Sequence, residues 1–306
     1  IAPVRTDKNQ ISAFISIMRG CNNMCSYCIV PYVRGRERSR DPQTILHESG
    51  DLMNQGFREI TLLGQNVDSY AWKNPDGTIM SFAELLDKTA QVNPNLRIRF
   101  STSHPKDLSD EVLQVMARHP NICRHIHLPV QSGSTRILKK MNRGYTREWY
   151  MNRIDAIHKY LPDCEITTDI MTGFCDETEQ DHQDTLSLME YAHYDFAYMF
   201  KYSERPGTKA ARRMKDNVPE ETKKRRLSEI IDLQNQISTE NKKKMVGRTF
   251  TVLVEGTSKK SQEEFSGRNS QNQVVVFPKN GEKTGDFVDV KIVDTTPATL
   301  IGEKIH

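Results

Sequence analysis

The sequence of 306 residues has no long apolar run, few cysteines and almost no net charge, and each of these absences excludes something. No stretch approaches the roughly 18 consecutive apolar residues of a membrane span. Residues 1–10 lack the apolar centre of a signal peptide, so we expect an intracellular protein without a membrane partner. Lys and Arg number 43 against 40 Asp and Glu, a net charge of +3, so a nucleic acid would have to be bound by local patches.

Only six cysteines occur, and three of them, Cys21, Cys25 and Cys28, fall within eight residues. A tight triplet in a cysteine-poor chain favours metal binding in a reducing compartment over disulfides, which indicates the cytoplasm. The chain does not begin with Met, and we expect part of the parent protein to lie before residue 1.

Six short apolar runs alternate with helical patterns over the first two thirds of the chain. Their starts are spaced as in β-α units, which favours buried parallel strands. Helix starts are marked by Asp41 before Pro42 and by a capping box of Ser81 with Glu84. The fold class is therefore α/β, either a partial barrel or an open doubly wound sheet. The six expected strands are residues 13–18, 59–63, 97–100, 126–130, 165–171 and 196–202.

The pattern changes after Tyr202. Residues 205–226 hold nine basic and three acidic side chains, the strongest charged patch of the chain. A long helix is expected from Pro219 to about Lys244, followed by strands at 250–254, 274–277, 286–293 and 299–301 that suit a small barrel. We predict a first domain over 1–216, a linking helix over 217–246 and a β-domain over 247–306.

The cysteine triplet has the pattern C-x-x-x-C-x-x-C and directly follows the first expected strand. Three thiolates can hold three irons of a [4Fe-4S] cluster and leave the fourth iron open to chelate a small molecule. A zinc site is the alternative, but it normally needs a fourth ligand, and the nearest candidate is His47 in an expected helix.

This motif resembles that of the radical S-adenosylmethionine (radical SAM) enzymes. Five segments narrow the resemblance to the methylthiotransferases: Met18-Arg-Gly-Cys-Asn-Asn, residues 28–40, Leu63-Gly-Gln-Asn-Val67, Leu128-Pro-Val-Gln-Ser-Gly-Ser134 and Ser203-Glu-Arg-Pro-Gly-Thr208. Gly64-Gln-Asn-Val67 and His127-Leu-Pro-Val-Gln-Ser-Gly133 resemble the tRNA branch, which methylthiolates isopentenyladenosine beside the anticodon. The C-terminal segment resembles a TRAM domain, a small RNA-binding barrel. The resemblance thus implies a partial (β/α)6 radical SAM barrel followed by an all-β TRAM barrel.

The resemblance also implies a set of site residues, with Cys21, Cys25 and Cys28 as ligands of the [4Fe-4S] cluster. Active sites of parallel barrels lie at the C-terminal ends of the strands, where polar side chains would orient S-adenosylmethionine. The strand-end residues are Gln65, Asn66, Ser101, Ser103, Gln131, Ser132, Asp169 and Gly173. Tyr27, the aromatic residue of the cysteine motif, is expected to join them. For RNA we expect the cationic loops and helices to provide Arg34, Arg36, Arg212, Arg225, Lys259, Lys260, Arg268 and Asn269, the last four on loops. No residue is assigned as a catalytic acid or base.

Two departures from the family pattern matter. Gly173-Phe-Cys-Asp-Glu-Thr178 stands where the family usually has Gly-Phe-Pro-Gly-Glu-Thr, and we expect Cys175 to be a buried small residue. The family also carries a second, sulfur-bearing cluster on an N-terminal domain, which we expect to be missing here. A flavodoxin or ferredoxin is the expected electron donor. The alternatives are a sister enzyme acting on another modified adenosine or a ribosomal protein, and a non-enzymatic metal-bearing RNA-binding protein.

Overall fold

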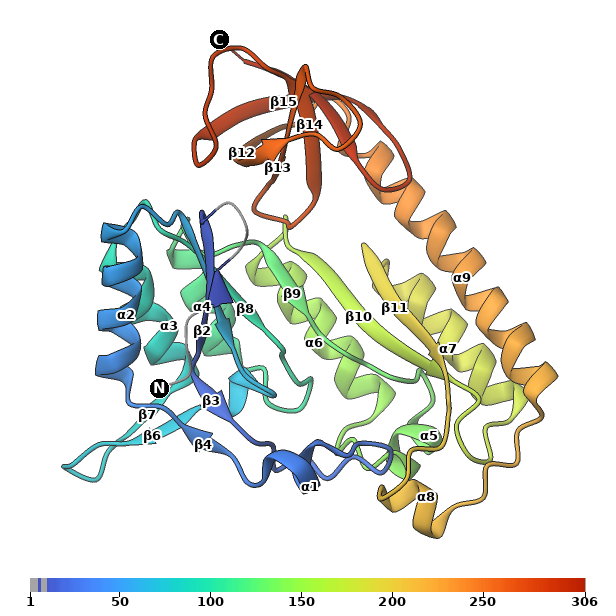
Figure 1. Cartoon of the computed structure of the whole chain (residues 1–306). Coiled ribbons are helices and arrows are strands. Elements are labelled where there is room, and N and C mark those ends of the chain that lie inside the picture. Colours follow the sequence, from blue (N-terminus) through green and yellow to red (C-terminus); the bar gives the residue numbers. More distant parts are fainter. Residues whose placement is uncertain (1–4, 7–9, 306) are drawn as a thin grey trace.

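The computed structural model describes residues 5–6 and 10–305, and its larger part is a curved arrangement of six parallel strands (Figure 1). One sheet has the order β1-β2-β5-β8 and the other β11-β10-β9. The sheets meet where Ile98 of β8 accepts from the backbone N–H of Cys123 at 2.9 Å and donates to Asn121 at 2.8 Å. The six strands are β2 (Ser12–Ser16), β5 (Glu59–Leu63), β8 (Arg97–Ser101), β9 (His125–His127), β10 (Glu165–Thr172) and β11 (Phe196–Lys201).

All six expected strands are present, which confirms the partial barrel over the open doubly wound sheet. The fourth is shorter than expected and ends at His127. Pro129 follows two residues later and has no N–H to donate, so the regular ladder cannot continue through it. β1 (Arg5–Thr6) pairs antiparallel with β2 and adds an edge strand.

Helices cover the outer face of the strands in chain order (Figure 1). Both expected helix starts are confirmed: Asp41 accepts from the N–H of Gln43, and Ser81 with Glu84 forms a capping box. The strand and helix side chains between them form one apolar core. The covering helices are α2 (Pro42–Asn54), α3 (Phe82–Val92), α4 (Asp110–Arg118), α6 (Arg147–Tyr160), α7 (Glu179–Ala192) and α9 (Glu220–Lys243).

Short elements complete this domain. They are α1 (Val30–Arg34), α5 (Thr135–Lys140), α8 (Lys209–Arg213), the 3-10 turn η1 (Val67–Ser69) and the hairpin strands β3 (Met18–Arg19), β4 (Arg38–Ser39), β6 (Ala71–Lys73) and β7 (Ile79–Ser81). No helix within the described residues is both long and apolar enough to span a membrane.

The long helix α9 does more than connect two domains. Ile230 and Ile237 belong to the same core as the barrel strands, and α9 packs on β10, β11 and α7. It therefore also serves as the last covering helix of the barrel.

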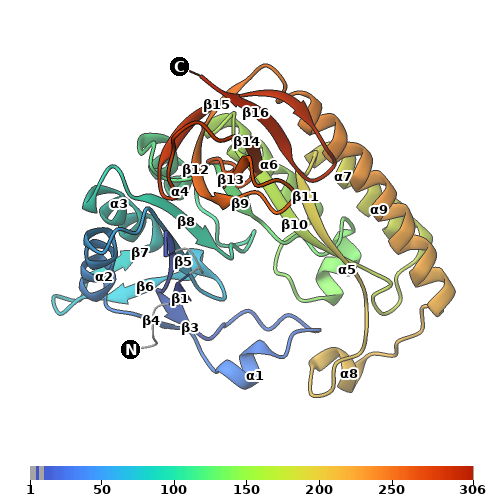
Figure 2. The same cartoon turned by 45° about the horizontal axis from the view of Figure 1, so that its top comes forward.

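The C-terminal part is a closed barrel of order β12-β13-β14-β16-β15 with its own apolar core. Its strands are β12 (Thr249–Thr257), β13 (Glu264–Arg268), β14 (Val274–Pro278), β15 (Phe287–Thr295) and β16 (Leu300–Lys304). β13 was not expected as a strand, because Ser266 and Gly267 have low strand propensity. The small barrel lies against the N-terminal ends of the parallel strands, at the end of the molecule opposite α1 and α8 (Figures 1 and 2).

Candidate active site

The loop that carries the three cysteines follows β3 at the C-terminal ends of the strands. It begins at Gly20, whose φ is +80° and where a Cβ would lie 2.1 Å from the carbonyl oxygen of Arg36. Only glycine fits this close approach of two backbones. The next residues are held by reciprocal hydrogen bonds between Asn22 and Glu37, so the 35–38 segment supports the loop.

Distant elements hold the rest of the cysteine loop. The N–H of Ser26 donates to the carbonyl of Met141 at 2.8 Å, and its carbonyl accepts from Ala210 at 2.7 Å. Asn142 donates to the carbonyl of Met24, while Lys106 donates to the side chain of Asn23. The loop is therefore positioned by chain segments from three different parts of the barrel.

All six cysteines are free thiols, and burial raises the pKa of Cys21 to about 11. Burial also raises the pKa of Cys28. A metal that binds these thiols must displace their protons, as is general for thiolate ligands.

The spacing of the three sulfurs bears on the zinc alternative. A tetrahedral zinc with bonds of about 2.3 Å holds its sulfurs about 3.8 Å apart. Among the described residues, the only group of three His, Cys, Asp or Glu donor atoms within 4.8 Å of one another is Glu179, His182 and Glu229. The thiols of Cys21, Cys25 and Cys28 are thus spread wider than one metal ion requires, whereas in a cubane each thiolate binds a different iron. His47, the nearest zinc candidate, is exposed on α2 and pairs with Asp51.

The predicted S-adenosylmethionine residues lie on strand ends that are hydrogen-bonded to one another. Gly64 donates to the carbonyl of Ser101 at 3.0 Å, Ser103 to that of His127 at 3.3 Å, and Gln131 to that of Asp169 at 2.8 Å. These contacts bring the ends of β5, β8, β9 and β10 into one continuous rim. Tyr27 joins this rim from the cysteine loop through a 3.4 Å contact between its hydroxyl and Arg143.

Several buried polar atoms in this rim have no partner within the described chain. They are Asn66 Oδ1, Asp68 Oδ1, Ser103 Oγ and His104 Nε2. Buried polar atoms are nearly always hydrogen-bonded in proteins. Four such atoms near the ends of β5 and β8 fit a polar cofactor bound there, and two of them belong to predicted cofactor residues, Asn66 and Ser103.

Two ionisable groups beside these atoms have shifted pKa values. Burial raises the pKa of Asp68 to about 7, against the hydrogen bond from the backbone N–H of His104 that lowers it. Burial and the nearby cations Arg143 and Lys106 lower the pKa of His104 to about 2. His104 is therefore neutral throughout the physiological range.

Other predicted cofactor residues differ in their exposure and partners. Gln65 is exposed, and the hydroxyl of Ser101 is within 3.1 Å of that of Thr102. Gln131 has a φ of +72° and is buried. The half-buried Asp169 lies 3.4 Å from Nε2 of His127.

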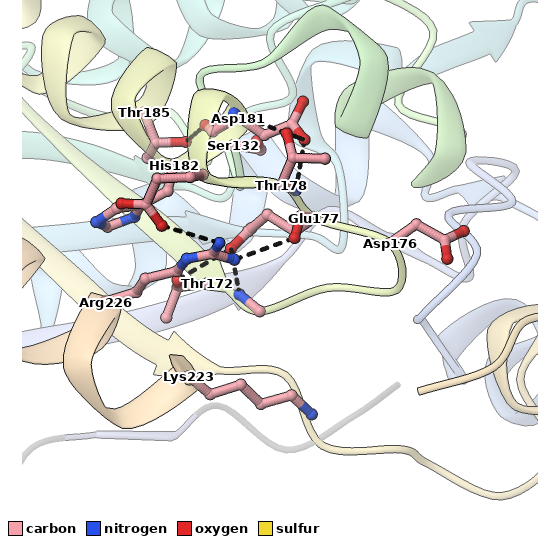
Figure 3. Close-up of polar contacts among 12 residues, drawn as sticks. Ser132, Thr172, Asp176, Glu177, Thr178, Asp181, His182, Thr185, Lys223 and Arg226 are labelled. Atoms are coloured by element: carbon pink, nitrogen blue, oxygen red, sulfur yellow. Dashed lines mark hydrogen bonds and ion pairs between the residues drawn. The ribbon is translucent and has the colours of Figure 1, made fainter. Parts of the chain in front are cut away.

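Ser132 and Gly173 both have structural partners within the chain, and Ser132 lies near Asp181 and Thr185 of α7 (Figure 3). The hydroxyl of Ser132 accepts from the N–H of Ser134. A Cβ on Gly173, whose φ is +72°, would lie 2.3 Å from the side chain of Lys223. These contacts explain both residue types without a ligand, and their cofactor role remains a prediction.

The same view shows a buried polar network that fixes the ends of β9 and β10 (Figure 3). Glu177 accepts from the N–H of Gly173 at 2.8 Å and from Arg226 at 2.9 Å. Asp181 accepts from Ser134, Arg136 and Thr178, and these bonds hold its pKa well below the usual range although burial alone would raise it. Cys175 is buried, as expected.

An aromatic row faces the inside of the barrel. Ala197 on β11 is buried in the core and Met199 packs against that core, so Phe196, Tyr198 and Phe200 point to the opposite face. They remain about half exposed. Tyr198 contacts His127 edge to face at 5.9 Å, which places the row beside the rim of polar strand ends. In the sequence, aromatic residues at every second position of the expected strand 196–202 could have indicated this face.

Exposed arginines gather around α1 and α8, next to the cysteine loop. Arg34 and Arg36 are exposed and Arg212 stacks over the ring of Tyr32 at 5.2 Å. Within the described residues, none of the three forms an ion pair with a carboxylate. Arg225, by contrast, pairs with both Glu179 and Glu229.

The predicted RNA-binding residues of the small barrel also include exposed side chains and side chains that are already paired or buried. Lys259 and Lys260 are exposed on the turn between β12 and β13. Arg268 lies within β13, not on a loop, and pairs with Glu255. Asn269 is fully buried where the two domains meet, so it does not lie on a surface that RNA can reach in this structure. The sequence pattern gave no sign of that interface.

Comparison with known proteins agrees with this geometry. The family model of the radical SAM superfamily matches residues 15–189, and that of the TRAM domain matches residues 243–305. A Bacteroides thetaiotaomicron protein named tRNA-2-methylthio-N(6)-dimethylallyladenosine synthase is 58% identical over 305 residues, covering 100% of this chain and 67% of the relative. A protein of the same name from Amoebophilus asiaticus is 57% identical over 314 residues, covering 99% and 65%.

The chain belongs to this family of radical SAM methylthiotransferases. It spans about two thirds of the length of these relatives. Membership of the radical SAM superfamily implies a [4Fe-4S] cluster and S-adenosylmethionine.

Solved structures support the radical SAM fold alone. A radical S-adenosylmethionine methyltransferase from Kitasatospora setae is 15% identical with a TM-score of 0.52, covering 65% of this chain and 38% of that one. Coproporphyrinogen III oxidase from Escherichia coli is 11% identical with a TM-score of 0.52, covering 84% and 66%.

Proposed function

We propose that this methylthiotransferase chain modifies N6-dimethylallyladenosine in tRNA to its 2-methylthio derivative by radical SAM chemistry. One observation carries the proposal: the three-cysteine loop lies against a continuous rim of polar strand ends, in a chain 58% identical along its whole length to synthases of that name. A structural metal site would not need the buried, unpartnered polar atoms of that rim.

In this proposal Cys21, Cys25 and Cys28 would each hold one iron of the cluster, and the strand-end residues would bind S-adenosylmethionine. When bound, the cluster and S-adenosylmethionine would together supply one-electron, hydrogen-abstracting chemistry. Asn66 and Ser103 offer buried polar atoms to the cofactor. The protein's part is alignment and exclusion of water, because no side-chain base can deprotonate an aromatic C–H at neutral pH.

The aromatic row on β11 suits the base of this substrate. Phe196, Tyr198 and Phe200 offer ring faces and edges to a purine and apolar area to its dimethylallyl group. Because the row lies on the same face as Asp169 and His127, a base held there would be close to the rim.

Two cationic regions would hold the rest of the tRNA. Arg34, Arg36 and Arg212 lie beside the cysteine loop, and Lys259 and Lys260 lie on the small barrel. Since the small barrel is at the opposite end of the molecule from α1 and α8, an RNA that touches both must run along its length (Figures 1 and 2).

The remaining partners follow from the same chemistry. We propose that the sulfur-donating second cluster is held outside residues 1–306, because Cys123, Cys164 and Cys175 are buried singly in the described structure. A flavodoxin or ferredoxin would supply electrons. Free thiols and a tRNA substrate fit the cytoplasm.

The decisive experiment uses the anaerobically reconstituted chain with S-adenosylmethionine, a reductant and an anticodon stem-loop that contains N6-dimethylallyladenosine. We expect iron–sulfur absorption near 400 nm and release of 5′-deoxyadenosine. Mass spectrometry should show the methylthio mark only when the second cluster is also supplied. A zinc-loaded, colourless protein would favour the non-enzymatic RNA-binding alternative. Modification of another adenosine or of a ribosomal protein instead would favour the sister enzymes.

A further inference from the structure

The side chain of Arg143 is buried directly beneath the cysteine loop. Its Nη1 lies 3.3 Å from the sulfur of Cys25 and 3.4 Å from the hydroxyl of Tyr27. Its Nη2 donates to the carbonyl of Pro129 at 2.7 Å, and its Nε to the hydroxyl of Tyr145 at 3.1 Å. All three nitrogens of the guanidinium are thus engaged with the cysteine loop, the segment after β9 or the hydroxyl of Tyr145.

None of these partners is a carboxylate, and in the described part of the chain Arg143 forms no ion pair. Other buried arginines do: Arg99 pairs with Glu59, and Arg226 with Glu177. A buried charge without a counterion is strongly destabilising. The hydroxyls of Tyr145 and Tyr27 are neutral hydrogen-bonding groups and cannot compensate the charge. The remaining contact that can carry negative charge is the sulfur of Cys25.

We propose that Arg143 is a positioning residue that donates a hydrogen bond to the Cys25 thiolate of the cluster and raises the reduction potential of that cluster. The inference rests on the proposed function in one respect, that Cys25 ligates the cluster. Reduction adds one negative charge, and a fixed cation in a water-poor site stabilises the reduced form more than the oxidised form. Through Pro129 the same guanidinium also ties the cluster loop to the segment that leads to Gln131.

The test is a redox titration of the reconstituted full chain followed by electron paramagnetic resonance, without substrate or turnover. Arg143→Gln keeps a donor but removes the charge, and we expect the ratio of reduced to oxidised cluster at a fixed potential to fall at least tenfold. A tenfold change is about 59 mV for a one-electron couple. Arg143→Lys keeps the charge and should change the ratio less. Arg153→Met removes a half-buried arginine that pairs with Asp110, and it should leave the potential unchanged.

Unchanged potentials in both Arg143 variants would overturn the inference. If the variants do not fold or do not load iron, the contact can still be tested in the unaltered chain labelled with 15N-arginine. Pulsed resonance of its reduced cluster should show hyperfine coupling to a guanidinium nitrogen, and absence of that coupling would refute the contact. Failure of the unaltered chain to build any iron–sulfur cluster would instead contradict the proposed function itself.

Discussion

Arg99 reaches across the domain boundary to Asn269, with Nη2 of the arginine 2.8 Å from the backbone carbonyl oxygen of the asparagine. The same guanidinium donates to Glu59 on the neighbouring strand at 2.9 Å and to the carbonyl of Ser270 at 3.2 Å. This buried cation thereby ties the small barrel to β5 and β8. Arg97 adds two further bonds, to the carbonyls of Arg268 and Thr251.

We predict that Arg99→Met lowers the free energy of unfolding by about 3 kcal/mol, because it leaves the carboxylate of Glu59 buried without its cation. Urea unfolding followed by circular dichroism measures the change. Arg118→Met is the matched control, since Arg118 forms an exposed pair with Asp87 worth about 1 kcal/mol or less. Equal losses in the two variants would contradict the role of Arg99.

Cys25→Ala should abolish iron–sulfur absorption after anaerobic reconstitution without unfolding the chain, because the core rests on the strands and helices. Cys123→Ala is the control: Cys123 is buried near Arg99 at the opposite end of β8, so this variant should load the cluster normally. The measurement is iron content per chain together with absorption near 400 nm. A full cluster in the Cys25 variant would remove this residue from the ligand set.

Asp68 should make stability depend on pH near neutrality. Its pKa in the folded chain is about 7, above the value of about 3.9 expected when unfolded, so the folded state binds the proton more tightly. The stabilisation from this group is complete below about pH 4 and is lost as the pH rises to about 7. Each unit of difference corresponds to about 1.4 kcal/mol. His104 stays neutral in the folded chain across this window and titrates at about pH 6.5 only when unfolded. Its contribution is therefore the same in the unaltered chain and in a variant of Asp68, and it cancels when the two are compared.

Asp68→Asn keeps an oxygen that can accept from the N–H of His104, which lies 3.0 Å from Oδ2 in the unaltered chain. We expect its melting temperature relative to the unaltered chain to rise as the pH increases from 5 to 8. Asp76→Asn, at an exposed turn, should show no such rise. A constant difference between Asp68→Asn and the unaltered chain across this range would show that the carboxyl of Asp68 is already ionised at pH 5.

The sequence predicted the regular part of this fold well, because parallel strands and capped helices leave local signals. The strand at 59–63 and the capping box at Ser81 needed no knowledge of distant contacts. β13 was missed because its place in the barrel depends on pairing with β12 and β14, which its own composition does not reveal. The packing of α9 on β11 was missed for a similar reason.

The site divides along the same line. The cysteine motif is local, so the sequence alone predicted it. Arg143 and Cys25 are 118 residues apart and meet only in the folded chain, so their contact could not be predicted. Asn269 looked like a loop residue for RNA because its burial depends on Arg99, 170 residues away. Motif resemblance locates such residues, but it does not say which neighbour each one contacts.

The aromatic row gives a prediction about substrate discrimination. Tyr198→Ala should reduce the preference for a stem-loop carrying the dimethylallyl group over one with plain adenosine by about tenfold, since the ring would cover part of this apolar group and each buried CH₂ contributes about 0.8 kcal/mol. Tyr191→Ala is the control, because Tyr191 is similarly exposed but lies on α7. Fluorescence anisotropy of both RNAs measures the preference. Reductive cleavage of S-adenosylmethionine should persist in both variants, and an unchanged preference in Tyr198→Ala would place the base elsewhere.

Arginines that are free to bind phosphate should contribute to RNA binding, whereas an arginine that is already paired should not. Arg34 and Arg36 lie on the surface beside the cysteine loop without a carboxylate partner among the described residues, so RNA can take up their charge. Arg225 is neutralised by Glu179 and Glu229, with distances of 2.7 Å to each. Each phosphate contact to single-stranded RNA contributes about 0.7 to the slope of log affinity against log salt. The double variant Arg34→Gln with Arg36→Gln should therefore weaken tRNA binding and reduce that slope by about 1.4, whereas Arg225→Gln should change neither. A loss of slope in Arg225→Gln would mean that RNA displaces its two carboxylates, and an unchanged slope in the double variant would leave RNA binding to the small barrel.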